Sequence, residues 1–138
     1  MSASIQLKKL WWAGPLTILA AIIGVLIVRT IAVAVLTPPL GPGLQMIMLP
    51  IVLTLILCTS AVLVFALVGR FAKNPVRTFI IISSIFLVIS FLPDLAVPSA
   101  AAMFPGANWS YAITLMIMHV IAGSITVYML IKVTTANN

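Results

Sequence analysis

Four long apolar stretches constrain the fold of this chain more than any other feature. An α-helix rises about 1.5 Å per residue, so about 20 apolar residues cross the roughly 30 Å of bilayer hydrocarbon. The sequence therefore predicts an all-α membrane protein, a four-transmembrane-helix bundle in a single domain over residues 1–138. The expected spans run from about Leu10 to Leu36, Leu44 to Val68, Thr78 to Leu95 and Ser110 to Ile131.

Composition excludes a water-soluble fold. Hydrophobic residues make up 64% of the chain and charged residues only 6%, whereas soluble domains carry roughly 25% charged residues. The net charge of +6 does not indicate nucleic-acid binding, because the basic residues flank apolar runs instead of gathering on one face of a soluble domain. The expected partner is the lipid bilayer, not nucleic acid.

The three connections contain residues that interrupt helices, because proline lacks a backbone N–H and clashes with the preceding turn. We expect Asn108 or Ser110 to cap the start of the fourth helix. The interrupting residues are Thr37–Gly43 in the first connection, Asn74-Pro75 in the second, and Pro93, Pro98, Pro105 and Gly106 in an irregular third.

Lys and Arg predict the orientation. With four spans, six of the seven basic residues fall on one side, which the positive-inside rule places in the cytoplasm. We therefore expect an N-in, C-in, multi-pass protein of the cell (plasma or inner) membrane. These six are Lys8, Lys9, Arg70, Lys73, Arg77 and Lys132.

A cleaved signal peptide ending at Ala32-Val33-Ala34 is the alternative interpretation of the first stretch. The apolar run before this site is longer than the usual 7–15 residues of a signal peptide. Arg29 also interrupts it just before the site. The pattern therefore favours a retained first span.

Three ionisable residues within or beside the spans are candidate functional residues: Arg29, Asp94 and His119. Counted from the inner interface, Arg29 lies about 25 Å and Asp94 about 24 Å up, both near the outer edge of the hydrocarbon. We hypothesise an Arg29–Asp94 ion pair between the first and third spans. The alternative is that Arg29 reaches lipid phosphates while Asp94 lies in a hydrated loop.

His119 is expected about 13–14 Å below the outer interface, near the midplane. It belongs to a stripe of small and polar residues that favours helix packing, so its ring should point into the bundle. Its expected hydrogen-bond partner is Thr54 or Ser90; a proton relay or ligand binding is the functional alternative. The other members of the stripe are Ala112, Met116, Ala122, Gly123 and Thr126.

Close helix packing is also expected in the first span, where Ala20 and Gly24 have the spacing of small residues at helix interfaces.

No catalytic set is visible in the sequence. Asp94 is the sole acidic side chain, so no second carboxylate is available for acid–base chemistry. Cys58 fits a small buried hydrophobe. His119 has no second histidine to share a haem or metal, so we expect no metal and no cofactor.

These features predict a non-enzymatic accessory, assembly or small-ligand-binding membrane component, as a homo-oligomer or within a larger membrane complex. The alternative is a small oligomeric transporter or proton-coupled channel that uses His119 together with Arg29 and Asp94.

The chain also resembles a family of small, uncharacterised bacterial four-span membrane proteins with a domain of unknown function. The resemblance covers most of the chain and implies a bacterial inner-membrane setting and no particular reaction. It rests on Leu10-Trp11-Trp12, the Pro38–Gly43 turn, Leu92-Pro93-Asp94-Leu95 and Met118-His119-Val120-Ile121-Ala122.

Overall fold

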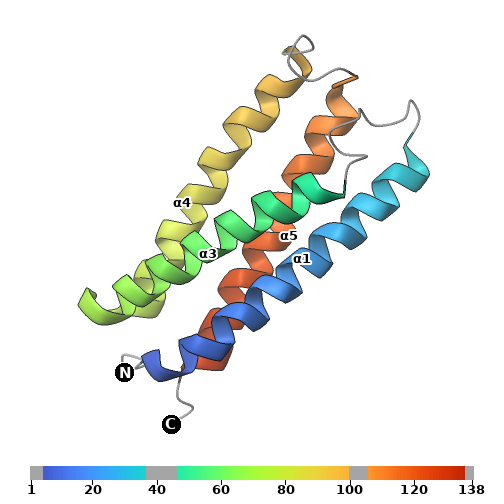
Figure 1. Cartoon of the computed structure of the whole chain (residues 1–138). Coiled ribbons are helices and arrows are strands. Elements are labelled where there is room, and N and C mark those ends of the chain that lie inside the picture. The colour runs from blue at the N-terminus through green and yellow to red at the C-terminus, as the bar shows by residue number, and fades with distance from the viewer. Residues whose placement is uncertain (1–4, 37–46, 100–105, 136–138) are drawn as a thin grey trace.

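The computed structural model describes residues 5–36, 47–99 and 106–135. This part of the chain forms four long helices, as the sequence predicts, and each is long and apolar enough to cross a membrane (Figure 1). Two short 3-10 helices, η1 (Leu7–Lys9) and η2 (Val97–Ser99), adjoin them. The long helices are α1 (Leu10–Val35), α3 (Met48–Phe71), α4 (Pro75–Ala96) and α5 (Trp109–Thr134).

Two prolines that were expected to interrupt the chain lie inside α4. The helix begins at Pro75 and not near Thr78, because a proline in the first turn gives up an N–H that has no partner in the helix anyway. The helix also continues through Pro93 to Ala96. A membrane helix tolerates such a proline where its neighbours compensate for the lost backbone bond.

The start of α5 is capped as expected. The Asn108 side chain accepts a hydrogen bond from the backbone N–H of Tyr111 at 2.9 Å, which satisfies a donor that the helix itself leaves free. The proline-rich turn Thr37–Gly43 and the first three residues of the expected second span, residues 44–46, lie outside the described residues.

The helices alternate in direction, and α5 holds the bundle together. It packs against α1 on one side and α4 on the other, while α3 contacts both α1 and α4. In Figure 1, α1 and α4 lie on opposite sides of the bundle, with α3 and α5 between them. Residues of α1 and α4 must therefore reach across α3 or α5 to meet.

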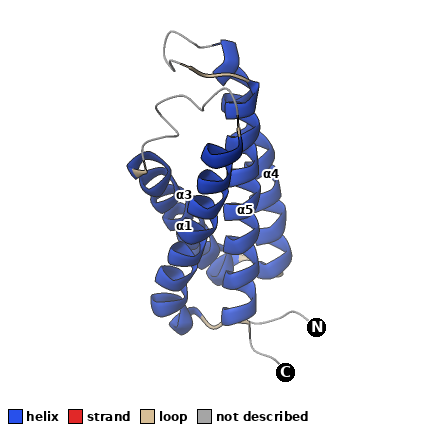
Figure 2. Cartoon of the chain, turned by 90° about the vertical axis from the view of Figure 1, so that its right-hand side faces the viewer, coloured by secondary structure: helices blue, strands red, loops and turns tan. Residues whose placement is uncertain are grey.

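The two ends of the described chain meet at one end of the bundle (Figure 2). The backbone N–H of Gln6 donates to the carbonyl oxygen of Thr134 at 2.9 Å, and Ile5 and Thr135 form an isolated antiparallel bridge. Both ends of the described chain thus lie at the same end of the bundle; which side faces the cytoplasm stays a prediction.

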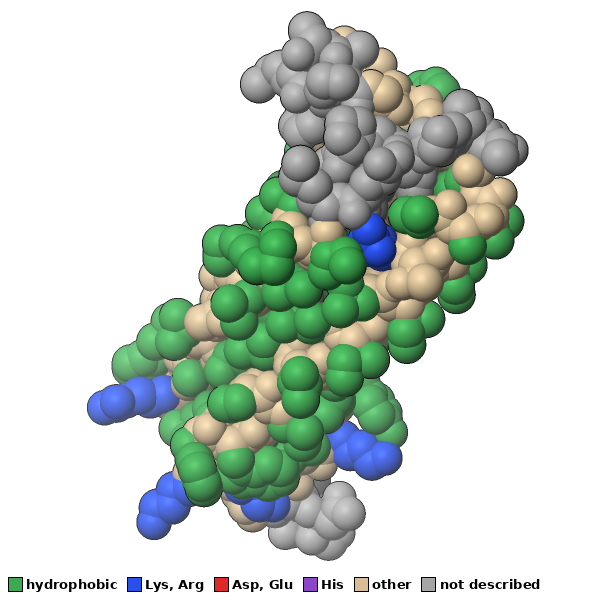
Figure 3. Space-filling view, turned by 45° about the vertical axis from the view of Figure 1, so that its right-hand side comes forward, with side chains coloured by type: hydrophobic (Ala, Val, Ile, Leu, Met, Phe, Trp, Pro, Cys, Tyr) green, Lys and Arg blue, Asp and Glu red, His purple; other side chains and the backbone are tan. Residues whose placement is uncertain are grey.

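Basic side chains gather at that same end, here called the basic end (Figure 3). Large apolar side chains cover much of the surface between the two ends, as a lipid solvent favours. Trp11, 80% exposed, and Trp109, 63% exposed, lie at opposite ends of the bundle, at the depths where amphipathic rings meet lipid headgroups. The basic end carries Lys8, Lys9, Arg70, Lys73, Arg77 and Lys132.

Two clusters of buried hydrophobic side chains pack the helices together, one toward each end of the bundle. Near the basic end, the rings of Phe65 and Phe79 meet edge to face at a centroid distance of 4.6 Å and pack with Leu130. Near the opposite end, Val25 of α1 packs with Tyr111 and Met118 of α5 and with η2.

Gly24 allows α1 and α5 to approach closely. A Cβ atom at this position would lie 2.7 Å from Cδ1 of Ile125 and 3.1 Å from Cγ2 of Ile121. Both distances are shorter than ordinary van der Waals contacts, so a larger side chain would force Ile121 and Ile125 of α5 to shift. This matches the expectation that small residues in the first span serve helix packing.

We predict that Gly24→Leu destabilises the bundle by about 1–3 kcal/mol through overpacking at the α1–α5 contact. The measurement is thermal unfolding in detergent, followed by loss of monodisperse protein. Ala34→Leu is the matched control, because Ala34 is exposed on the same helix. Equal melting temperatures for the two variants would contradict the close approach.

Candidate functional site

The sole acid and the sole histidine of the chain meet inside the bundle. Nδ1 of His119 on α5 lies 2.8 Å from Oδ2 of Asp94 on α4. The Asp94 side chain is only 5% exposed, whereas the His119 side chain is 26% exposed. The carboxylate is therefore enclosed by protein, and the imidazole is partly exposed.

The directions of the side chains explain why two residues expected at different depths meet. The expected depths were about 6 Å and about 14 Å below the outer edge of the hydrocarbon for Asp94 and His119. Side chains lean toward the N-terminus of their own helix. Because α4 and α5 are antiparallel, Asp94 leans toward the middle of the bundle and His119 toward its end, which closes the gap.

The hydrogen bond orients the imidazole ring. An ionised carboxylate only accepts hydrogen bonds, so Nδ1 carries the proton whenever Asp94 is charged. A carboxylate on one ring nitrogen fixes the tautomer and leaves the other nitrogen for chemistry or binding. Within the described residues Nε2 of His119 has no hydrogen-bond partner.

The predicted partners of the histidine are corrected by this geometry. Among the described residues, neither Thr54 nor Ser90 bonds to His119; Ser90 Oγ donates instead to the carbonyl oxygen of Leu87 at 2.7 Å on its own helix. Thr54 is buried on α3. A helical serine can bond its hydroxyl to a backbone carbonyl of its own helix. A buried carboxylate needs a hydrogen-bond donor, and His119 supplies one to Asp94.

The hypothesised pair of Arg29 with Asp94 stays a prediction. Arg29 is half-buried on α1, and α1 lies across the bundle from α4. The contact that the structure gives for Asp94 is the one with His119.

His119 also lines a crevice between α3, α4 and α5 with a volume of about 150 Å³. Its walls are mainly apolar, with Phe79 and Phe86 from α4 and Val64 from α3. Ser90, which sequence spacing had placed near His119, lines the same crevice. The crevice therefore offers an apolar enclosure with an oriented imidazole in its wall.

A hydrogen bond between α3 and α5 also contributes to this crevice. Cys58 Sγ and Thr126 Oγ1 lie 3.3 Å apart, and both side chains are buried. Cys58 is buried as expected, but its contact with Thr126 was missed. The stripe on α5 contained Thr126, yet nothing in the sequence indicated which residue of α3 would face it.

In residues 5–36, 47–99 and 106–135, no three His, Cys, Asp or Glu side chains come together. What the Asp94–His119 pair provides is hydrogen bonding and proton exchange at Nε2.

Fold and site together define the class: a four-helix, multi-pass membrane protein with an Asp–His pair between two of its helices. The chain belongs to a family of unknown function, DUF6069, which it matches over residues 5–136. No curated protein and no solved structure matches it.

We predict that Asp94 and His119 contribute to stability as a coupled pair. In a double-mutant cycle of Asp94→Asn and His119→Gln, the two effects on the free energy of unfolding should deviate from additivity by about 0.5–3 kcal/mol. The same cycle with Ser90→Ala in place of Asp94→Asn is the control and should be additive. Arg29→Gln combined with Asp94→Asn tests the remaining ion-pair prediction. Additivity between Asp94 and His119 would show that their contact carries no coupling.

Proposed function

We propose that the protein is a non-enzymatic, small-ligand-binding component of the membrane. The observation that carries this proposal is the imidazole of His119, held by Asp94 in the wall of an apolar crevice. Its ligand is a small amphipathic molecule that dissolves in the bilayer. The apolar part of the ligand fills the crevice, and an oxygen or a hydroxyl of its polar part pairs with Nε2.

The energetics of the histidine support a polar group on the ligand. A polar atom inside hydrocarbon costs free energy unless it is hydrogen-bonded. Nδ1 of His119 is satisfied by Asp94, and Nε2 is the ring atom that a ligand can satisfy. A ligand that supplies this hydrogen bond gains affinity over an apolar molecule of the same shape.

Entry from the bilayer is also consistent with the position of the crevice. Ser60 of α3 and Ile82 and Phe86 of α4 line it and are themselves exposed at the surface of the bundle. A molecule dissolved in lipid therefore reaches the crevice between α3 and α4 without passing through water.

A proton-coupled transporter is the second candidate, and one observation favours it. Asp94 and His119 form a titratable pair within a membrane-spanning bundle, and such pairs serve as proton relays in transporters. The two candidates differ in whether protons cross the membrane.

We predict that the wild-type protein, purified in mild detergent and extracted with organic solvent, releases an amphipathic small molecule that mass spectrometry detects at a fixed ratio to protein. His119→Gln should lower the ratio severalfold by removing the polar contact, and Ala61→Phe should abolish retention by filling the crevice. Leu63→Phe is the matched control, because Leu63 is 61% exposed on the same helix. The same extract from all variants, or none from the wild type, would contradict ligand binding in the crevice.

Proton flux separates the two candidates. Under the binding proposal, liposomes containing the wild-type protein acidify no faster than protein-free liposomes when a pH gradient is imposed and a pH-sensitive dye is enclosed. His119→Gln should leave this rate unchanged. Flux that the wild type supports and His119→Gln removes would establish the transporter instead.

A further inference from the structure

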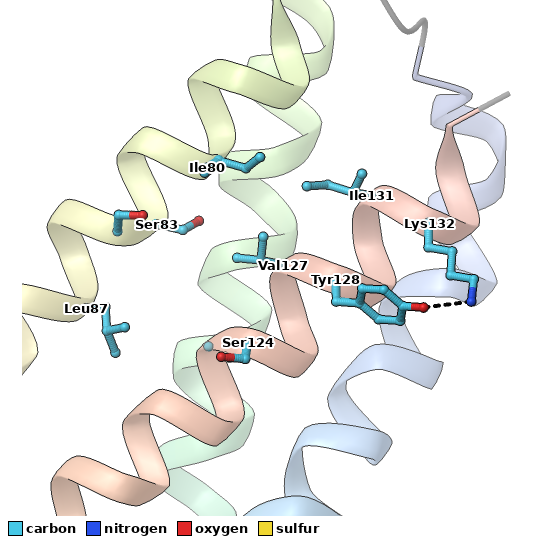
Figure 4. Close-up of a pocket in the computed structure, with 10 residues that line it drawn as sticks. Ile80, Ser83, Leu87, Ser124, Val127, Tyr128, Ile131 and Lys132 are labelled. Carbon is cyan, nitrogen blue, oxygen red and sulfur yellow. Dashed lines mark hydrogen bonds between the residues drawn. The ribbon is translucent and has the colours of Figure 1, made fainter. Parts of the chain in front are cut away.

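A second hollow lies on the face of the bundle formed by α4 and α5, toward the basic end (Figure 4). It has a volume of about 430 Å³. Ile80 and Leu87 come from α4, and Val127 and Ile131 from α5. This α4–α5 groove shares part of its lining with the crevice but does not include Asp94 or His119, so a role for it goes beyond the function proposed above.

Small side chains keep the groove open. Ser83 and Ser84 of α4 and Gly123 and Ser124 of α5 line it where the two helices face each other. A Cβ atom on Gly123 would come no closer than 3.8 Å to Leu87 Cδ1, which is an ordinary contact. The helices are therefore not tightly packed at this level, in contrast to the α1–α5 contact at Gly24.

The side-chain ammonium of Lys132 lies at the mouth of the groove. Lys132 Nζ donates to the hydroxyl oxygen of Tyr128 at 2.7 Å, and it lies 5.0 Å from the centroid of the Tyr128 ring. Figure 4 shows this bond beside the apolar lining. Arg77 precedes Ile80 by three residues and Ser84 by seven, so it lies on the same face of α4, and it is exposed.

The length of the groove matches one leaflet of a bilayer. Lys132 is in the last turn of α5, at headgroup depth. Ser124 lies about 12 Å deeper along α5, and Leu87 lies about 18 Å from the start of α4. Half of the hydrocarbon is about 15 Å thick, so the groove extends from the headgroups to the region of the midplane.

The charges of the chain indicate which kind of molecule binds in the α4–α5 groove. Asp94 is the sole acidic side chain, and it is buried beside His119 toward the opposite end. Among the described residues no carboxylate lies beside Lys132 or Arg77, so charge complementarity favours an anion from outside the chain. A second copy docked on this face by a two-fold axis would bring the same cations together without an acid between them, which costs free energy.

We propose that the α4–α5 groove binds an anionic phospholipid of the leaflet at the basic end. One acyl chain lies along Ile80, Leu87 and Val127, and Lys132 and Arg77 bind the phosphate. Tyr128 holds the Lys132 ammonium at the mouth through their hydrogen bond.

The test is native mass spectrometry of the full chain titrated with phosphatidylglycerol or phosphatidylcholine of identical acyl chains. The wild type should retain phosphatidylglycerol in preference to phosphatidylcholine. Lys132→Gln and Arg77→Gln should each lower phosphatidylglycerol retention about fivefold, as expected for one basic residue near an anionic headgroup. Lys132→Arg should keep the preference. Lys73→Gln should keep it too, because Lys73 lies in the turn before α4 and so outside the helix face that carries Arg77, Ile80 and Ser84.

Two outcomes would overturn the proposal. Equal retention of the two lipids by the wild type would show that no phosphate is recognised. An equal loss in Lys73→Gln and Lys132→Gln would show a diffuse surface charge instead of a site. Ser124→Leu, which fills the groove without altering charge, should lower retention of both lipids. Monodisperse elution and an unchanged melting temperature for each variant confirm that the compared proteins are folded.

Discussion

Lipid offers no hydrogen bonds, so polar groups within the spans need partners inside the protein. Most hydroxyls of this bundle find theirs locally: Thr30, Thr59 and Thr114 each bond to a carbonyl four residues earlier on the same helix. A carboxylate cannot be satisfied in this way, because backbone carbonyls donate nothing. Asp94 finds its donor on the neighbouring helix, and its contact with His119 joins α4 to α5.

Both hollows of the described structure border the α4–α5 contact. The crevice beside α3 and the groove on the opposite face share Ser83, Leu87, Gly123 and Val127 in their linings. Above this level Asp94 and His119 join the two helices, and below it Phe79 and Leu130 pack in a buried cluster. Small residues such as Ser83 and Gly123 thus leave a hollow on each side of the α4–α5 pair. The crevice contains the imidazole of His119, and the groove contains the ammonium of Lys132.

Local signals in the sequence predicted local structure well. Asn108 caps α5 because its side chain needs only the backbone three residues ahead, and Gly24 lies at a helix contact because small residues suit close approach. Pro75 was expected in the connection and instead begins α4, since a proline in the first helical turn gives up no intrahelical bond. Pro93 lies inside α4, consistent with the expected end of the third span near Leu95. The depths estimated from the rise per residue put Asp94 and His119 at different levels of the membrane. Such an estimate gives the position of each residue along the helix axis and ignores the direction of its side chain.

Hydrophobic length and charge asymmetry are properties of the chain itself. The sequence alone therefore determined four membrane helices, their alternating directions and a basic end, and it singled out Arg29, Asp94 and His119 as the ionisable residues that lipid tolerates least. Which helices become neighbours depends on how all four surfaces fit together. Only the tertiary structure decided that α5 lies between α1 and α4, that Asp94 and not Thr54 or Ser90 bonds to His119, and that hollows open on both sides of the α4–α5 contact.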